Sequence, residues 1–145
     1  SSDNQLWLLD ISPMNLVKYD INFNTISIQQ PLQQLADTIK IKPYQLLEYQ
    51  NRVYLGDSEI GILVFDNLGN YLHTLPKSGH EIFYPLKEEL YFIKDGKLEF
   101  IHIYEHRRRS NPLPGTSSGF EKVLLTGRKA LLLSNKQYAL YSYKP

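Results

Sequence analysis

The sequence predicts an all-β fold: a β-propeller, or part of one, built of four-stranded antiparallel blades. Three observations predict it. Apolar strands recur about every 40 residues. Turns rich in Asp, Asn and Gly separate the strands. Tyrosine, which favours strands, occurs 11 times in 145 residues. The strands amount to about three and a half blades, because the first repeat lacks a leading strand and the last lacks an outer one.

Two columns of apolar residues define the repeat. The first column has spacings of 47, 37 and 40 residues, and the second has spacings of 46, 36 and 40. A period near 40 with several strands per unit is typical of a propeller blade. The units cover approximately residues 4–36, 37–77, 78–115 and 116–145 of a single domain, 1–145. The first column is Trp7, Tyr54, Tyr91 and Leu131, and the second is Tyr19, Phe65, Ile101 and Tyr141.

Each unit contains two anchored strands joined by a polar turn. The turns are expected at residues 12–15, 57–61, 95–96 and 134–136, and Asp95-Gly96 is the strongest short hairpin signal. A further turn at 66–70 leads into an outer strand, "NYLHTLP". Leading strands precede the last three pairs, in "KIKPYQLLEY", "HEIFYPLK" and "FEKVLLT".

The segments "WLLDI", "GILVF" and "EFIHIY" are apolar on both faces, as expected for strands packed between two sheets. Residues 31–40 have the best helical spacing, and we expect a loop or one short turn there, with a short helix as the alternative. An open stack of three to four blades would expose an apolar sheet face at each end. We therefore expect blades from the same protein or from a second chain to complete it.

Composition excludes several classes of function. The formal charge of +1 gives no basis for nucleic-acid binding, and no apolar stretch is long enough to span a membrane. No cysteine is present, so disulfides and cysteine-based zinc sites are excluded. The charge is uneven, however. Residues 1–70 hold eight acidic and four basic residues, whereas residues 71–145 hold seven acidic and twelve basic ones. This asymmetry either orients a partner or is a chance imbalance of solvated surfaces.

The segments "NQLWLLDISPMNLVKYD", "VYLGDSEIGILVFDNLGNYL", "ELYFIKDGKLEFIHIY" and "ALYSYKP" resemble the C-terminal part of a family of small exported β-propeller proteins from Bacteroidetes. Members of that family are longer and carry a signal peptide, which this sequence does not show. The resemblance implies a periplasmic or secreted protein. It also implies attachment to outer-membrane machinery, such as the plug of the type IX secretion translocon. It supplies no catalytic motif.

No metal site or cofactor site is expected. His102 and His106 are four residues apart, which on the predicted strand is roughly 13 Å, too far to share one metal ion. The segment Asp66 to Asn70 has oxygen ligands like a calcium loop but lacks the full motif, so a hairpin turn is favoured.

Catalytic residues are not expected either. Two carboxylate pairs, Glu88-Glu89 and Asp57 with Glu59, each lie within a single turn, whereas glycosidases take theirs from separate elements. Residues 117–119 lack the G-x-S-x-G pattern of a serine nucleophile.

Residues 105–119, "EHRRRSNPLPGTSSG", are the most distinctive segment, and we expect a loop there. Arginine presents planar donors that suit carboxylate or phosphate. Arg107, Arg108 and Arg109 are therefore the candidate partner-binding residues, contacting an acidic protein patch or lipid headgroups. The alternative is a solvated loop whose charges prevent edge aggregation.

The sequence thus favours a non-enzymatic protein-interaction scaffold of the bacterial cell envelope. It would bind a partner through propeller rim loops, with an accessory or plug role in outer-membrane secretion as the role implied by the resemblance. One alternative is a carbohydrate- or peptidoglycan-binding module, which needs exposed aromatic residues clustered at a rim. The other is a propeller-fold hydrolase or lyase, which needs acids, histidines or a metal converging on a central channel.

Overall fold

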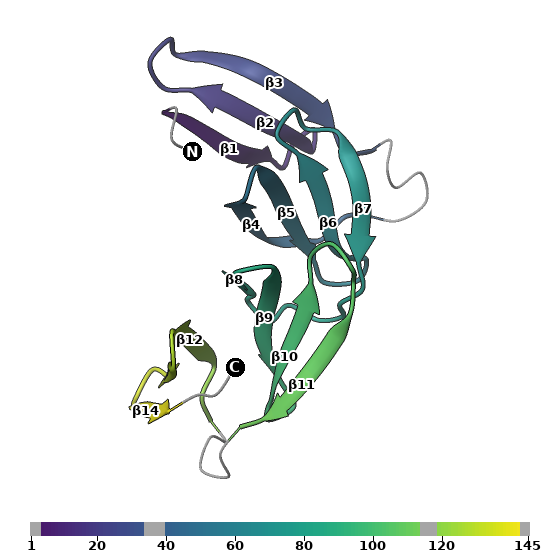
Figure 1. The fold of residues 1–145 in the computed structure, drawn as a ribbon. Helices are drawn as coiled ribbons and strands as arrows, with labels where there is room; N and C mark the ends of the chain where they lie inside the picture. Colours follow the sequence, from purple (N-terminus) through teal and green to yellow (C-terminus); the bar gives the residue numbers. More distant parts are fainter. Residues whose placement is uncertain (1–3, 34–39, 114–118, 143–145) are drawn as a thin grey trace. The chain divides into compact units, whose positions relative to one another are not determined.

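The structure is a computed structural model that describes residues 4–33, 40–113 and 119–142. It confirms the all-β prediction. Within those ranges the chain forms 14 strands in four antiparallel sheets of three or four strands, and no α-helix (Figure 1). Residues 34–39, which form most of the segment with helical spacing, lie outside the described residues. The chain divides into two compact units, Ser1–His80 and Glu81–Pro145.

The first unit holds two sheets, each formed by strands that are consecutive in the chain. The first sheet has the order β1-β2-β3 and the second has the order β4-β5-β6-β7. The first consists of β1 (Gln5–Asp10), β2 (Asn15–Asp20) and β3 (Thr25–Pro31), and the second of β4 (Pro43–Tyr49), β5 (Arg52–Asp57), β6 (Gly61–Asp66) and β7 (Tyr71–Leu75).

The second unit repeats this plan with a four-stranded and a three-stranded sheet. Their orders are β11-β10-β9-β8 and β12-β13-β14. The strands are β8 (Tyr84–Leu86), β9 (Glu89–Lys94), β10 (Lys97–His102), β11 (Arg108–Pro112), β12 (Lys122–Thr126), β13 (Lys129–Leu133) and β14 (Tyr138–Ser142). The first column of repeat anchors lies in β1, β5, β9 and β13, and the second lies in β2, β6, β10 and β14.

The predicted tight turns connect the strands. Lys94 pairs with Lys97, and the two residues between them, Asp95 and Gly96, have φ of 50° and 71°. Positive φ at both central positions is the geometry of the type I′ hairpin that Asp-Gly favours, so this prediction is confirmed.

A hydrophobic core fills the first unit between its two sheets. Val53 and Phe65 from the second sheet pack with Leu16 of β2, and all three are fully buried. Trp7 and Leu9 of β1 pack against the same cluster. Alternate residues of β1 and β2 therefore face the second sheet.

The second unit has an equivalent core. Tyr91 and Phe100 from the β8–β11 sheet pack with Val123 of β12 and Leu132 of β13. The half-buried ring of Tyr141 on β14 joins the cluster. Each unit is therefore a pair of sheets stacked face to face.

The prediction of strands buried on both faces holds for β6, whose residues from Gly61 to Phe65 are all buried. It is wrong for β1, which alternates between half-buried and exposed residues. Leu6 and Leu8 of β1 are 47% and 46% exposed. The reason is that the core of the first unit contacts only the other face of the first sheet.

Candidate partner-binding site

The arginine segment does not form the expected loop, because Arg108–Pro112 is strand β11, paired with β10. A tight reversal precedes it. The His102 carbonyl accepts the His106 N–H at 2.9 Å, and the Arg107 carbonyl accepts the His102 N–H at 2.8 Å. The strand lies at the edge of its sheet, where Pro112, which has no N–H group, is tolerated because no further strand needs that donor. Residues 114–118 of the predicted loop lie outside the described residues.

Strand alternation separates the three arginines. Arg109 faces the side of the sheet that holds Phe100, its partner in the register with β10. Arg108 faces the opposite side and is exposed. Arg107 lies in the reversal before the strand and is exposed as well. The side chains of Arg108 and Arg109 therefore leave the strand on opposite faces.

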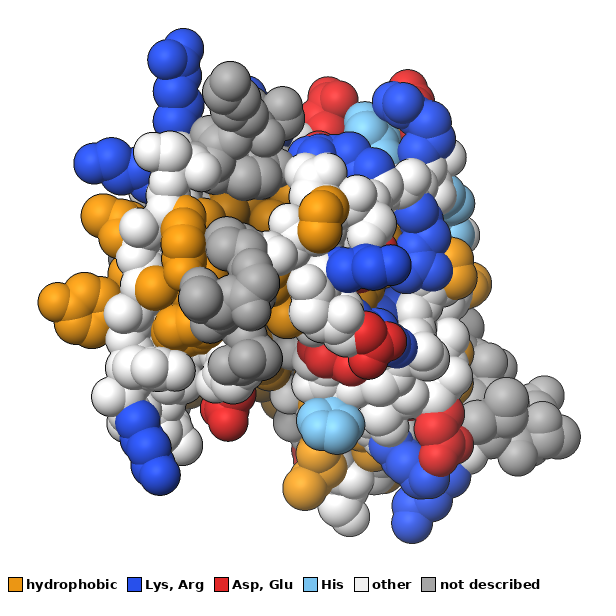
Figure 2. Space-filling model, turned by 90° about the horizontal axis from the view of Figure 1, so that it is seen from below, with side chains coloured by type: hydrophobic (Ala, Val, Ile, Leu, Met, Phe, Trp, Pro, Cys, Tyr) orange, Lys and Arg blue, Asp and Glu red, His pale blue; other side chains and the backbone are white. Residues whose placement is uncertain are grey.

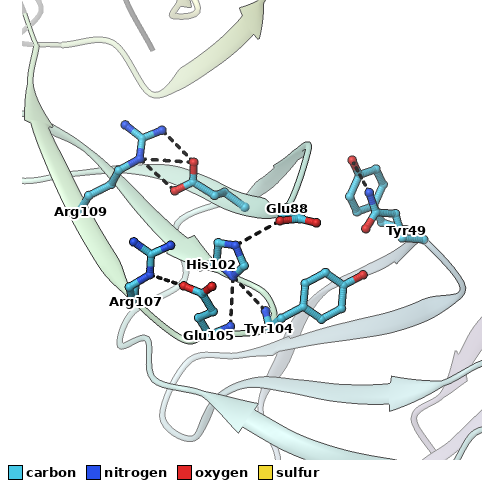
Figure 3. A network of polar contacts seen from close by, with 9 residues as sticks. Tyr49, Glu88, His102, Tyr104, Glu105, Arg107 and Arg109 are labelled. Atoms are coloured by element: carbon cyan, nitrogen blue, oxygen red, sulfur yellow. Dashed lines mark hydrogen bonds and ion pairs between the residues drawn. The ribbon is translucent and has the colours of Figure 1, made fainter.

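Arg109 is held within its own sheet. Its Nε donates to Glu89 Oε2 at 2.9 Å and its Nη2 donates to Glu89 Oε1 at 2.8 Å, a bidentate pair (Figure 3). Its guanidinium carbon lies 3.6 Å from the centroid of the Phe100 ring. A paired and stacked guanidinium holds the edge strand to β9 and β10. Sequence reasoning missed Glu89 as its partner, because the two residues are 20 positions apart.

Arg107 and Arg108 are the arginines that a partner can reach. Arg107 pairs with Glu105, two residues away, and both side chains are more than half exposed. Such a surface pair is worth at most about 1 kcal/mol and can be exchanged for another carboxylate. Among the residues that the structure describes, Arg108 has no carboxylate partner.

The three arginines line a pocket of about 320 Å³ together with Glu89 and His102. His102 is fixed in this pocket by both ring nitrogens. Its Nδ1 accepts the N–H of Glu105 at 3.0 Å and of Tyr104 at 3.3 Å, and its Nε2 lies 3.3 Å from Glu88 Oε2 (Figure 3). An Nδ1 that accepts two amide protons assigns the Nε2–H tautomer, which donates to Glu88. His102 therefore helps to shape the reversal before β11.

The expectation that His102 and His106 lie on one strand is wrong, because β10 ends at His102 and His106 closes the reversal with φ of 59°. Both nitrogens of His102 are already engaged, so the pair offers no ready metal ligands. No cluster of three or more metal-binding side chains occurs in the described ranges 4–33, 40–113 and 119–142.

The carboxylates that the sequence singled out have separate partners. Glu88 contacts His102, and Glu89 binds Arg109. Asp57 is buried and accepts the N–H groups of Glu59 and Ile60 at 2.9 and 2.8 Å. It therefore shapes the turn between β5 and β6.

Asp66 occupies the turn that resembles a calcium loop. Its Oδ1 accepts the N–H groups of Leu68 and Asn70 at 2.9 and 2.8 Å, and its Oδ2 accepts Asn70 Nδ2 at 3.0 Å. Partial burial by itself raises the pKa of Asp66, but the hydrogen bonds from Asn70, Leu68 and Gly69 outweigh it and lower the pKa below its usual value. The carboxylate stabilises the predicted hairpin turn.

Comparisons with known proteins show a likeness of fold. No family model matches the chain, and no curated protein matches its sequence. The structure is similar to PorZ of Porphyromonas gingivalis, described as an essential bacterial surface component of the type-IX secretion system. The TM-score is 0.64 at 16% identity, over 95% of this chain and 19% of PorZ. The chain thus spans about a fifth of the length of that protein.

Two computationally designed proteins are similar as well. Ika4 matches with a TM-score of 0.66 at 13% identity, over 99% of this chain and 88% of Ika4. Ika8 matches with a TM-score of 0.66 at 14% identity, over 98% of this chain and 44% of Ika8. The described part of the chain contains no helix with the length and apolar character needed to cross a membrane.

Proposed function

We propose that the four sheets are blades of a β-propeller and that the protein is a non-enzymatic interaction scaffold of the bacterial cell envelope. The observation that carries the proposal is the likeness to a surface component of a secretion system over 95% of this chain. Four consecutive antiparallel sheets with a sequence period near 40 residues support the blade interpretation. Since fold alone transfers function poorly, the contact surface has to be argued from its residues.

The proposed contact surface consists of Arg107 and Arg108, at the reversal and start of the edge strand β11. Both side chains are exposed. Arg109 holds the strand in place beneath them through Glu89 and Phe100. Guanidinium groups on a fixed edge suit the carboxylates of a partner protein, which Arg binds in bidentate geometry.

The proposed location is the periplasm or the cell exterior, and the proposed role is attachment to outer-membrane secretion machinery. The support is the likeness to PorZ together with the sequence resemblance to exported propeller proteins. The carboxylates singled out in the sequence each have a structural partner, with Glu59 paired to Lys42, which favours binding over hydrolysis. No specific observation favours a carbohydrate-binding module.

The experiment is a fluorescence-anisotropy titration of the protein with a labelled hexaglutamate peptide at low salt. We expect saturable binding that weakens as salt is raised. The double variant Arg107→Gln/Arg108→Gln is expected to bind about tenfold more weakly, because two charge-assisted contacts are lost.

The matched control is Arg128→Gln, which removes an exposed arginine from the β12–β13 turn. It is expected to bind the peptide as the unmodified protein does. Equal weakening in the control would mean that net charge alone drives binding and would contradict the proposed surface. Binding to phosphatidylglycerol vesicles without binding to the peptide would contradict the choice of a protein partner.

A further inference from the structure

The first sheet exposes an apolar face, which we call the first-sheet outer face. The register places Leu6 opposite Tyr19, Leu8 opposite Val17, and Tyr19 opposite Ile26. These side chains alternate with those that pack in the core, so they share the other side of the sheet. Leu6, Leu8 and Ile26 are 47%, 46% and 56% exposed. Large side chains gathered in this way on one face indicate an interaction surface.

The last sheet exposes a second such face, the last-sheet outer face. Leu124, Leu131 and Leu140 form one row across its three strands, and Leu133 lies opposite Tyr138 in the next row. Tyr138 and Leu140 are 76% and 58% exposed. Figure 2 shows hydrophobic side chains gathered on its left, the side on which Figure 1 places β14, with Lys or Arg side chains at both ends.

The repeat indicates what covers these faces. In the first unit the face that bears Trp7, of the first anchor column, packs on the face that bears Phe65, of the second column. In the second unit the face that bears Tyr91 packs in the same way with Tyr141. In both units, therefore, the sheet face that bears a first-column anchor packs on the sheet face that bears a second-column anchor.

The two outer faces carry anchors that have no partner sheet within their units, and the other two such anchors, Tyr54 and Ile101, are fully buried. The last-sheet outer face bears Leu131, of the first column, and the first-sheet outer face bears Tyr19, of the second column. In both cores a face that bears a first-column anchor packs on a face that bears a second-column anchor. By the same rule, the face that bears Leu131 should pack on a face that bears Tyr19. A second copy of the chain supplies both kinds.

The charges on the two faces are complementary. Asp10 follows Leu8 on the first-sheet outer face and is exposed. Lys122 and Lys129 lie at opposite ends of the last-sheet outer face, in the same alternation as Leu124 and Leu131, and both are exposed. The excess of acidic residues before residue 71 and of basic residues after it has the same sense. Opposite signs favour contact between unlike faces and disfavour contact between like faces.

We propose that two copies of this chain associate head to tail, with the first-sheet outer face of each copy packed on the last-sheet outer face of the other. The inference rests on the proposed blade repeat but not on the arginine surface. Each copy offers one face of each kind, so a two-fold arrangement uses both. The contact extends the sheet-on-sheet packing of the two cores across a chain boundary.

Light scattering after size exclusion tests the association, over a wide range of concentrations. The unmodified protein is expected to have twice the monomer mass, and to dissociate on dilution. Leu8→Glu and Leu140→Glu are each expected to raise the dissociation constant about tenfold or more, because a charge is placed in the apolar centre of a face. Leu68→Glu, at a 63% exposed position in the β6–β7 turn, is the matched control and should remain dimeric. A monomer at every concentration would overturn the proposal.

A charge exchange tests the pairing of unlike faces. Asp10→Lys alone and Lys122→Asp/Lys129→Asp alone should each be monomeric, since like charges then meet at both contacts. A mixture of the two variants should recover the dimer, because both contacts become attractive again. Circular dichroism checks that each variant is folded. A mixture that remains monomeric while both variants are folded would overturn the head-to-tail arrangement, whatever the outcome of the peptide titration.

Discussion

The hydroxyl oxygen of Tyr91 on β9 accepts a hydrogen bond from the backbone N–H of Leu125 on β12, at 3.0 Å. This buried bond joins the two sheets of the second unit. Burial raises the pKa of the Tyr91 hydroxyl, while the bond from Leu125 lowers it by less. Tyr91, an anchor of the repeat, therefore also binds a specific backbone N–H group of the neighbouring sheet.

Tyr91→Phe is expected to lower the free energy of unfolding by about 1–3 kcal/mol, because the N–H of Leu125 is left buried without an acceptor. Urea unfolding at neutral pH measures this loss. Tyr138→Phe, measured at a concentration low enough to dissociate the proposed dimer, is the control, since Tyr138 is 76% exposed in the single chain and its change should be close to zero. Equal midpoints for the two variants would show that the hydroxyl of Tyr91 does not link the sheets.

Gly61→Ala is expected to lower the free energy of unfolding by about 3 kcal/mol. Gly61 has φ of 125°, and an added Cβ would lie 2.5 Å from the Leu75 carbonyl oxygen. Gly96→Ala should cost only about 1 kcal/mol, because Gly96 also has positive φ but an added Cβ meets nothing within 4 Å. Thermal unfolding of both variants compares the two. If Gly96→Ala is the more destabilised variant, the close approach of Gly61 to the Leu75 carbonyl oxygen does not limit the side chain at position 61.

Arg109→Lys is expected to lower the free energy of unfolding by about 1 kcal/mol, because lysine cannot bind Glu89 in bidentate geometry while it stacks on Phe100. Arg108→Gln should change it by less than about 0.5 kcal/mol, as is usual for an exposed position. Urea unfolding separates the two arginines. A similar loss of unfolding free energy in both variants would mean that the bidentate pair with Glu89 does not contribute to stability.

Asp66→Asn tests the lowered pKa of the Asp66 carboxyl group in the β6–β7 turn. A carboxylate whose pKa is lower in the folded state stabilises the fold above its unfolded pKa of about 3.9, and that contribution is lost as the pH falls through the folded value. The unmodified protein should therefore be more stable than Asp66→Asn at pH 7. The difference should shrink in acid. Urea midpoints measured across this range check it, and a difference that is independent of pH would refute the assignment.

Much of the fold can be predicted from the sequence, because period and turn chemistry are local signals. The Asp95-Gly96 hairpin and the leading strands before Tyr54 and Tyr91 follow from short segments. The exposure of the outward face of β1 cannot be predicted in this way, because the apolar residues from Leu6 to Leu9 do not indicate whether a second sheet covers that face. Packing partners that are distant in the chain decide that exposure.

The candidate site was predictable only in part. The run of three arginines was visible in the sequence, but its division between two faces of a strand was not. That division depends on where the reversal after His102 ends, and Arg107 therefore precedes the strand while Arg108 begins it. Glu89 is adjacent to Glu88 in the sequence, yet the two bind different partners, because Glu88 lies in the turn between β8 and β9 whereas Glu89 begins β9.

The most direct test of the repeat-based account is chemical cross-linking between the two outer faces. Since the chain has no cysteine, Leu8→Cys and Leu140→Cys each introduce a single thiol. With a short bismaleimide linker, we expect cross-linked dimers when the two variants are mixed and little product from either variant alone. Leu68→Cys mixed with each is the control and should give none. Efficient cross-linking of either variant with itself, or none in the mixture, would contradict the pairing of unlike faces.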